Sequence, residues 1–380
     1  MIASIRNIAL ACCGFLLLMA CQPQSPADDP PPVVETDTPP TNPAPSGIAS
    51  TPQEYEVVVD QLRLRDAPGI EGKVITELSR GTRLLDLGEI SDFTTKVKLR
   101  GIAYDEPWIK VKTSDGQEGW IFPGGLKMLN TSLSEANRAI IDRRLQAMFG
   151  VALSNNIAAY RGQFESAKDD ASFAVAYDVG ERLRDTMVRV LENYAVYEDE
   201  YTPQDLFWLN HALPGYVTSL AAEGTQYYLF CDFKAMGRKA SQTTGSTDDA
   251  FVQLNYSIHP LDSVGYFFPV WFMQTWDYGG HSLLGKGHHF DVLQQMEALH
   301  QRGPLFKKPL AAIKAKLLED ITADYVEYWQ SQEEILAELR RIQEADFTIL
   351  SQADKVAIAT RAKMFEHPED NNIRVNLRAG

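Results

Sequence analysis

Three groups of residues in this 380-residue chain have types that could do chemistry, and the first is a histidine cluster. His281, His288 and His289 are set among glycines, and imidazoles together with a carboxylate such as Asp277 or Asp291 are ligands that zinc prefers. Their spacing, His-x6-His-His, lacks the i,i+4 helical pairing or the paired-cysteine pattern of specific zinc motifs. We therefore predict no metal site here, and interpret the segment as a glycine-rich surface loop with a helix-capping histidine.

The second group is Cys231, which with a distant histidine would supply the elements of a cysteine hydrolase such as a cell-wall peptidase. It lies inside the strongly apolar run 226–233. A nucleophilic thiolate favours a helix N-terminus and a cationic neighbour, whereas a buried thiol is inert. We predict a structural thiol. Because the chain also lacks a nucleophile elbow, a phosphate loop and a dinucleotide fingerprint, we predict no catalytic residue and no cofactor.

The third group is an aromatic run, residues 266–278, with seven aromatic side chains in 13 positions. Aromatic residues at this density are typical of the centre of a core, or of a recognition groove for sugar rings or partner side chains. We favour the core, because an exposed patch of this size would promote association. Trp271 and Trp276 are kept as candidate ligand-binding residues.

The N-terminus predicts export. Arg6 is the only charge in residues 1–20, and an apolar run of 13 residues follows at 8–20, a length typical of a signal peptide and too short to span a bilayer. The run ends in Leu18-Met19-Ala20-Cys21, which resembles the lipobox of bacterial lipoproteins. The resemblance implies cleavage after residue 20 and acylation of Cys21, with the protein anchored on the outer face of the inner membrane or on the outer membrane. The alternative is an ordinary secretory signal with a free cysteine.

Residues 21–51 are interpreted as the lipidated cysteine and a linker. Nine of the 29 residues at 22–50 are proline and four are acidic, so this segment favours extended polyproline II and cannot bury apolar area. At about 3.1 Å per residue it would reach roughly 90 Å. Cys231 would then be the only thiol of the mature chain, and we predict no internal disulfide.

The segment 52–130 predicts a small all-β barrel. Short stretches of period-two alternation recur with turn residues between them, as in Leu62-Arg63-Leu64-Arg65 before Asp66-Ala67-Pro68-Gly69. Between residues 93 and 100 the alternation places three cations on one strand face, Lys96, Lys98 and Arg100. These three residues and Trp108 are candidate ligand-binding residues. For Trp108 and Trp120 we favour a core position, because barrel strands bury one face.

The segment resembles the bacterial SH3 domain family. The motifs that carry the resemblance are 62–68 (LRLRDAP), 73–75 (KVI), Gly81-Thr82, 108–111 (WIKV), Asp115-Gly116 and 118–121 (EGWI). The resemblance implies a targeting module that binds peptidoglycan peptides or envelope proteins, rather than a catalyst. Arg63 stands where the family usually has Asn, and the stretch from Thr82 to Trp108 is longer than usual. We expect an added hairpin at about residues 93–105.

From residue 131 onward the apolar residues recur with a helical period, which predicts one all-α domain over 131–380. Ser132 to Glu135 has the form of a capping box for the first helix, and a second stripe follows at 175–194. A third helix is expected after Thr202, a very long amphipathic stretch at 310–342, and a last helix from Ser351 that ends before Pro368.

The formal charge is −15, and no segment is strongly basic, so we predict no nucleic-acid partner. The sequence predicts a multidomain, lipid-anchored envelope protein that binds peptidoglycan or an envelope protein without catalysis. The alternative is a cell-wall or metal-dependent hydrolase with the helical domain as its catalytic part. For the cationic face we slightly favour contact with the acidic helical domain over contact with an external anion.

Overall fold

The computed structural model describes residues 53–99, 102–130, 133–194, 206–221, 226–260, 268–275 and 279–379. All of them belong to one compact unit that begins at Thr51. The expected signal peptide (1–20) and the lipidated cysteine with its linker (21–51) lie outside the described residues, as do Arg100 and Trp276.

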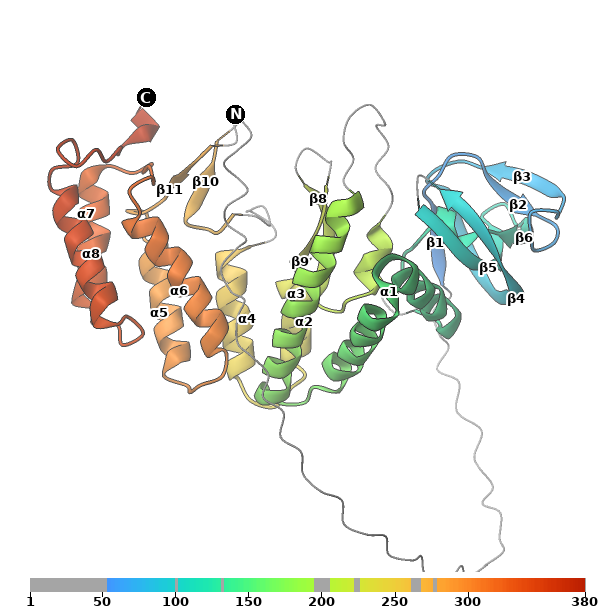
Figure 1. Ribbon diagram of the computed structural model, residues 1–380, viewed down its shortest axis with the longest axis horizontal. Helices are drawn as coiled ribbons and strands as arrows, with labels where there is room; N and C mark the ends of the chain where they lie inside the picture. Colours follow the sequence, from blue (N-terminus) through green and yellow to red (C-terminus); the bar gives the residue numbers. More distant parts are fainter. Residues whose placement is uncertain are drawn as a thin grey trace, which may run out of the picture. The chain divides into compact units, whose positions relative to one another are not determined.

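The first part of the described chain is an antiparallel sheet (Figure 1). It has seven strands in the order β3-β2-β6-β5-β4-β1-β7. Its strands are β1 (Glu54–Val57), β2 (Leu62–Arg65), β3 (Val74–Leu78), β4 (Arg83–Leu99), β5 (Ile102–Thr113), β6 (Glu118–Ile121) and β7 (Leu126–Met128). In the described residues β3 and β7 are the two ends of the sheet and do not pair with each other. The expected barrel closure is therefore not observed. Alternation predicts which face of a strand is buried, whereas closure depends on tilt and on pairing between the end strands.

The longest feature of the sheet is the β4–β5 hairpin (Figure 1). Its register places Lys96 opposite Asp105 and Leu99 opposite Ile102. The register shifts twice, between Asp86 and Ile90 and between Ile90 and Thr94. Such bulges bend a strand and increase its twist. The hairpin expected at about 93–105 is present as the outer half of this pair of strands.

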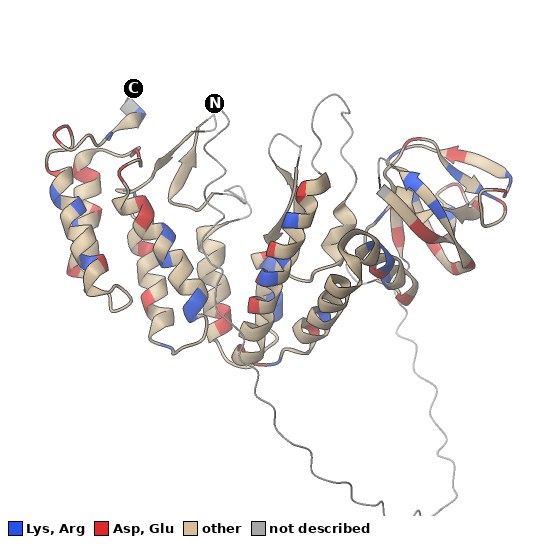
Figure 2. Ribbon diagram, in the orientation of Figure 1, with Lys and Arg blue, Asp and Glu red and all other residues tan. Residues whose placement is uncertain are grey.

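The described residues after the sheet contain eight α-helices. They are α1 (Glu135–Ser166), α2 (Asp170–Leu191), α3 (Phe233–Ala240), α4 (Thr247–Ile258), α5 (His288–His300), α6 (Lys307–Thr322), α7 (Gln332–Glu344) and α8 (Gln352–Phe365). Helix α1 is kinked at Gly150, which has φ +79° and ψ 163°. Acidic and basic residues are interspersed along the helices (Figure 2).

The expectation of an all-α second domain was wrong in one respect, because two β-hairpins lie within it. They are β8 (Tyr216–Ala221) with β9 (Gln226–Cys231), and β10 (Phe272–Gln274) with β11 (Gly280–Ser282). Strand β9 has the sequence QYYLFC and buries every second residue. Short apolar runs of this kind fit a strand or a buried helix equally well, and here the aromatic residues pack against a pleated surface.

The helix boundaries also differ from the expected ones. The long amphipathic stretch at 310–342 is divided between α6 and α7, because Ser331 begins a new helix with a capping box to Glu334. Helix α1 has Ser134 as its N-cap, with a hydrogen bond from the Asn137 backbone N–H. The short 3₁₀ turn Phe207–His211 is the described part of the expected third helix. Helix α8 ends at Phe365, before Pro368, as expected.

Buried polar contacts join the sheet to the helices. The Arg144 guanidinium of α1 donates to both carboxylate oxygens of Glu106 on β5, at 2.5 and 3.1 Å, and to the backbone oxygen of Pro123 at 2.8 Å. The Tyr55 hydroxyl lies 2.9 Å from the side-chain amide of Asn137. His211 donates from Nε2 to the backbone oxygen of Met128 at 3.1 Å. These contacts determine how α1 packs on the sheet.

Candidate functional site

Two exposed cations lie on the outer half of β4. Lys96 and Lys98 alternate with the partly buried Val97 and Leu99, so both ammonium groups point to the solvent face of the strand. Neither lysine forms an ion pair with any residue that the structure describes. The sequence favoured a contact between the cations of the sheet and the acidic residues of the helices. The buried ion pair between the two parts has the reverse arrangement, because the acid, Glu106, is on the sheet and the base, Arg144, is on helix α1. Lys96 and Lys98 are therefore available to an external partner.

The sheet region also has exposed apolar side chains. Of ten large hydrophobic residues that are exposed in the described chain, six lie in the sheet strands or the β2–β3 turn: Ile70, Val74, Ile75, Leu85, Ile90 and Phe93. Phe93, 44% exposed, lies over Gly69, where an added Cβ would meet its ring at 3.5 Å. Ile70 in the same turn is 58% exposed. Sequence reasoning missed the exposure of these side chains, because alternation does not reveal which face of a two-stranded hairpin is covered by the rest of the fold.

Trp108 lies in the core of the sheet, with only 3% of its surface exposed. Its indole N–H donates to Thr95 Oγ1 at 2.9 Å, and its ring meets Phe122 edge to face with centroids 5.7 Å apart. The Arg65 guanidinium lies 5.9 Å from the ring centroid. Trp108 therefore supports the base of the β4–β5 hairpin and presents no free face to a ligand.

The three histidines of the glycine-rich segment have separate surroundings. His289 is fully buried, and its Nε2 lies 2.7 Å from Asp320, which also accepts a hydrogen bond from Ser282. His281 stacks on Trp329. His288, the first residue of α5, is half-buried, and burial holds the pKa of its imidazole below the usual value. The three do not form a common set of metal ligands. Within the described ranges, the one group at metal-binding distances is the exposed set His367, Glu369 and Asp370.

Cys231 is buried at the end of β9, opposite Tyr216. Burial raises the pKa of its thiol, and the nearby Glu181 carboxylate acts in the same direction. A thiol in this environment stays protonated and is a poor nucleophile. The arrangement does not provide what a cysteine hydrolase needs at this position.

Sequence reasoning also missed a cavity of about 770 Å³ lined by α2, β9, α4 and α6, to which Trp271 contributes. Within it Glu181 accepts a hydrogen bond from the Tyr216 hydroxyl at 3.0 Å and pairs with Arg184 at 3.1 Å. Burial raises the pKa of the Glu181 carboxyl. Burial also lowers the pKa of His259 to about 4, so its imidazole is neutral at pH 7. Perturbed groups gathered in a cavity are a frequent feature of binding sites.

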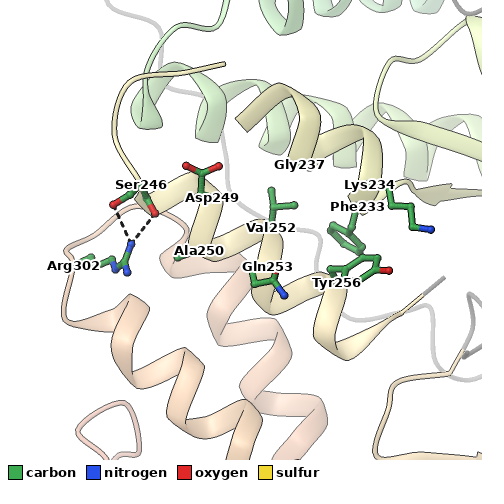
Figure 3. Close-up of a pocket in the computed structure, with 10 residues that line it drawn as sticks. All are labelled: Phe233, Lys234, Gly237, Ser246, Asp249, Ala250, Val252, Gln253, Tyr256 and Arg302. Carbon is green, nitrogen blue, oxygen red and sulfur yellow. Dashed lines mark hydrogen bonds between the residues drawn. The ribbon is translucent and has the colours of Figure 1, made fainter. Parts of the chain in front are cut away.

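A second, shallower pocket of about 570 Å³ lies between α3 and α4 (Figure 3). The Arg302 guanidinium at the edge of this pocket already has protein partners. It donates to the Ser246 backbone oxygen at 2.7 Å and to Ser246 Oγ at 3.3 Å. Phe233 and Tyr256 form the apolar part of the wall (Figure 3). This pocket is a surface feature of the α3–α4 pair.

Comparison with known proteins identifies the domain family of the sheet region. The family model of the bacterial SH3 domain matches residues 60–127, which include most of β2 to β7 and the whole β4–β5 hairpin. No curated protein matches the chain. Among the described helices, none is both long and apolar enough to cross a membrane. The sheet region at residues 60–127 is thus a bacterial SH3 domain, the family to which this part of the chain belongs.

Proposed function

We propose that this protein is a lipid-anchored cell-envelope protein whose SH3 domain binds an envelope component, peptidoglycan or a protein, without catalysis. The observation that carries the proposal is the bacterial SH3 domain at residues 60–127, a type of domain associated with the cell wall and envelope. The lipobox-like Leu18-Met19-Ala20-Cys21 and the proline-rich residues 22–50 support an acyl anchor with a spacer.

The outer half of the β4–β5 hairpin is the surface that we assign to the ligand. Lys96 and Lys98 are exposed cations in a chain of charge −15, so an anionic partner would be attracted locally rather than by the net charge. Ile90 and Phe93 add exposed apolar area nearer the base of the same strand, with Phe93 on the face opposite the two lysines. Peptidoglycan stem peptides combine carboxylates with short apolar side chains, which fits both features.

The test is sedimentation with purified peptidoglycan at about 10 mM salt, where charges act over about 30 Å. The wild-type protein should pellet with the wall. Lys96→Glu/Lys98→Glu should pellet with about tenfold lower affinity, because two attractive charges become repulsive. The control is Lys307→Glu/Lys363→Glu, which makes the same charge change at exposed positions on α6 and α8 and should behave as wild type.

The outcomes separate the possible functions. Absence of pelleting at low salt would exclude wall binding and leave an envelope protein as the partner. Equal loss in both double variants would assign the effect to net charge and remove the hairpin as the ligand surface. Release of soluble wall fragments by the purified protein would support the alternative, a cell-wall hydrolase, for which the cavity containing Glu181 and Arg184 is the candidate centre.

A further inference from the structure

A slot of about 570 Å³ lies in the C-terminal part of the chain, where four segments distant in sequence meet. It is lined by residues of the β10–β11 hairpin, the glycine-rich loop before α5, the connection between α6 and α7, and the C-terminal segment. We call it the Trp329 slot. It includes neither Glu181 nor Cys231, and it is separate from the SH3 domain.

Backbone hydrogen bonds hold these segments together. The Leu283 N–H donates to the Trp271 oxygen at 2.7 Å, which joins the glycine-rich loop to the segment before β10. The Trp329 N–H donates to the Ser282 oxygen at 3.0 Å, and the Asn376 N–H donates to the Gln330 oxygen at 2.8 Å. The slot is therefore part of the folded frame and does not depend on side chains alone for its shape.

The inner surface of the slot is mainly apolar. Phe272, Met273 and Trp329 are each only partly buried and line it, together with Leu283. The Trp329 ring is fixed by stacking on His281, with centroids 5.7 Å apart and an interplanar angle of 22°. Half-buried aromatic and thioether side chains around a cavity of this volume are typical of small-molecule sites.

Every ionisable side chain that lines the slot is basic: Lys286, His288 and Arg378. Arg378 is held in place by Glu334 at 2.8 Å and by Gln330 at 3.4 Å. Lys286 and His288 have no side-chain hydrogen bond or ion pair with any part of the chain that the structure describes. In a chain of charge −15, Lys286 is thus a cation at the slot that has no ion-pair partner among the described residues.

The neighbouring carboxylate Glu338 forms no ion pair with Lys286 or His288, although Glu338 and Asp291 both raise the pKa of His288 and offset part of the effect of burial. Its oxygens accept hydrogen bonds from the backbone N–H groups of Gly285, Gly287 and Phe290. The N-terminus of α5 is thereby already occupied, so the attraction for an anion in the slot comes from the Lys286 ammonium. The imidazole of His288, whose pKa is lowered by burial, contributes a hydrogen-bond donor.

We propose that the Trp329 slot binds a small molecule that has an apolar or aromatic body and one anionic group, with the body against Trp329, Phe272 and Met273 and the anion at Lys286 and His288. The walls supply apolar contact, and the basic edge selects the sign of the ligand charge. The site and its ligand class are independent of the envelope ligand of the SH3 domain.

Isothermal titration calorimetry of the full chain at pH 7 tests whether the slot selects the charge of its ligand. Three probes share the same naphthyl body and differ in charge. The probes are 1-naphthylacetate, 2-(1-naphthyl)ethanol and 2-(1-naphthyl)ethylammonium. The carboxylate should bind about tenfold more tightly than the alcohol, and the ammonium should bind most weakly, because a charge-assisted hydrogen bond is gained or a repulsion introduced. Equal affinities of the three, or no binding of the carboxylate at millimolar concentration, would overturn the proposal.

Two variants locate the site. Lys286→Glu, at an exposed position, should lower the affinity for naphthylacetate about tenfold and spare the alcohol, whereas Lys307→Glu should change neither. In ¹³C-methyl methionine spectra, the Met273 methyl resonance, assigned with Met273→Leu, should shift on addition of naphthylacetate. Naphthylacetate binding that leaves the Met273 methyl unmoved and is insensitive to Lys286→Glu would place the ligand elsewhere and refute the assignment.

Discussion

At the scale of single residues, burial decides which chemistry is possible. His259 lies at the end of α4 and lines the cavity that contains Glu181. Burial is the main cause that lowers the pKa of its imidazole to about 4, and the ammonium of Lys316 contributes in the same direction. A hydrogen bond with the backbone of Phe268 offsets part of this effect. The neutral imidazole makes the folded state sensitive to acid.

The sign of this sensitivity follows from proton binding. Between pH 6.5 and 4 the unfolded chain protonates His259 and the folded chain does not, so stability is lost as the pH falls through this window. Between pH 7 and pH 4.5, His259 should lower the free energy of unfolding of the wild-type protein by about 2–3 kcal/mol. In His259→Gln this part of the pH dependence should be absent. Urea unfolding of both proteins at several pH values measures the difference. Parallel pH profiles for the two proteins would contradict the prediction.

At the scale of elements, helix α1 depends on one glycine. Gly150 has φ +79° and ψ 163° in the middle of a 32-residue helix, and it joins two helical halves at a kink. A Cβ added at Gly150 would meet no atom within 4 Å, so packing does not require glycine there. The backbone conformation does, because L side chains rarely adopt it.

Gly150→Ala should therefore destabilise the protein by about 1–3 kcal/mol through backbone strain. The matched control is Gly162→Ala in the same helix, where the backbone is helical and the surroundings are open. That change should stabilise by up to about 1 kcal/mol, because alanine is the better helix former. Urea denaturation of the two variants should give shifts of opposite sign. A neutral or stabilising effect of Gly150→Ala would contradict the prediction, because it would show that the kink does not require a residue with positive φ at position 150.

At the scale of the whole molecule, one buried ion pair joins the SH3 domain to the helices. Arg144 and Glu106 have side chains that are 3% and 1% exposed, and the guanidinium also lies 5.3 Å from the Tyr104 ring centroid and 5.8 Å from that of Trp208. Each charge has been taken out of water and depends on its partner. The local pattern of the sequence does not indicate that a desolvated pair joins the two parts, because Glu106 and Arg144 meet only in the folded chain.

Removal of either partner alone should be costly. Arg144→Met or Glu106→Leu each leaves an uncompensated buried charge, which costs about 3–5 kcal/mol. The double variant Glu106→Leu/Arg144→Met removes both charges and should lose much less than the sum of the single changes. Urea unfolding of the four proteins gives the coupling energy. Additive losses would show that the two side chains act independently.

The anchor is also a property of the whole molecule. Cys21→Ser should release the protein from membranes and abolish incorporation of labelled palmitate, since two or three acyl chains are the proposed attachment. Cys231→Ser is the matched control, because its thiol is buried in the fold and should not affect either measurement. Fractionation of cells that express each variant tests this. Membrane association of Cys21→Ser equal to that of wild type would refute the lipoprotein interpretation.

Much of the SH3 domain was predictable from local pattern. The alternation at 62–65 and 108–111 and the turns at Gly81 and Asp115-Gly116 identified strands that the structure contains. The start of the last helix was predictable too, because Ser351 and Asp354 form a capping box within four residues. In each case the residues that determine the structure are neighbours in sequence, so the pattern already contains the interaction.

The sequence by itself determined the family of the SH3 domain, the hairpin added at about 93–105 and the starts of the first and last helices, because alternation, turns and caps depend on nearby residues. Only the tertiary structure decided that residues 226–231 are a strand, because that depended on pairing with 216–221. It also decided that Lys96 and Lys98 have no ion-pair partner among the described residues, and that Met273, Lys286, Trp329 and Arg378 meet in one slot. These outcomes rest on contacts between residues far apart in the chain, and local periodicity contains no information about which distant surfaces pack together.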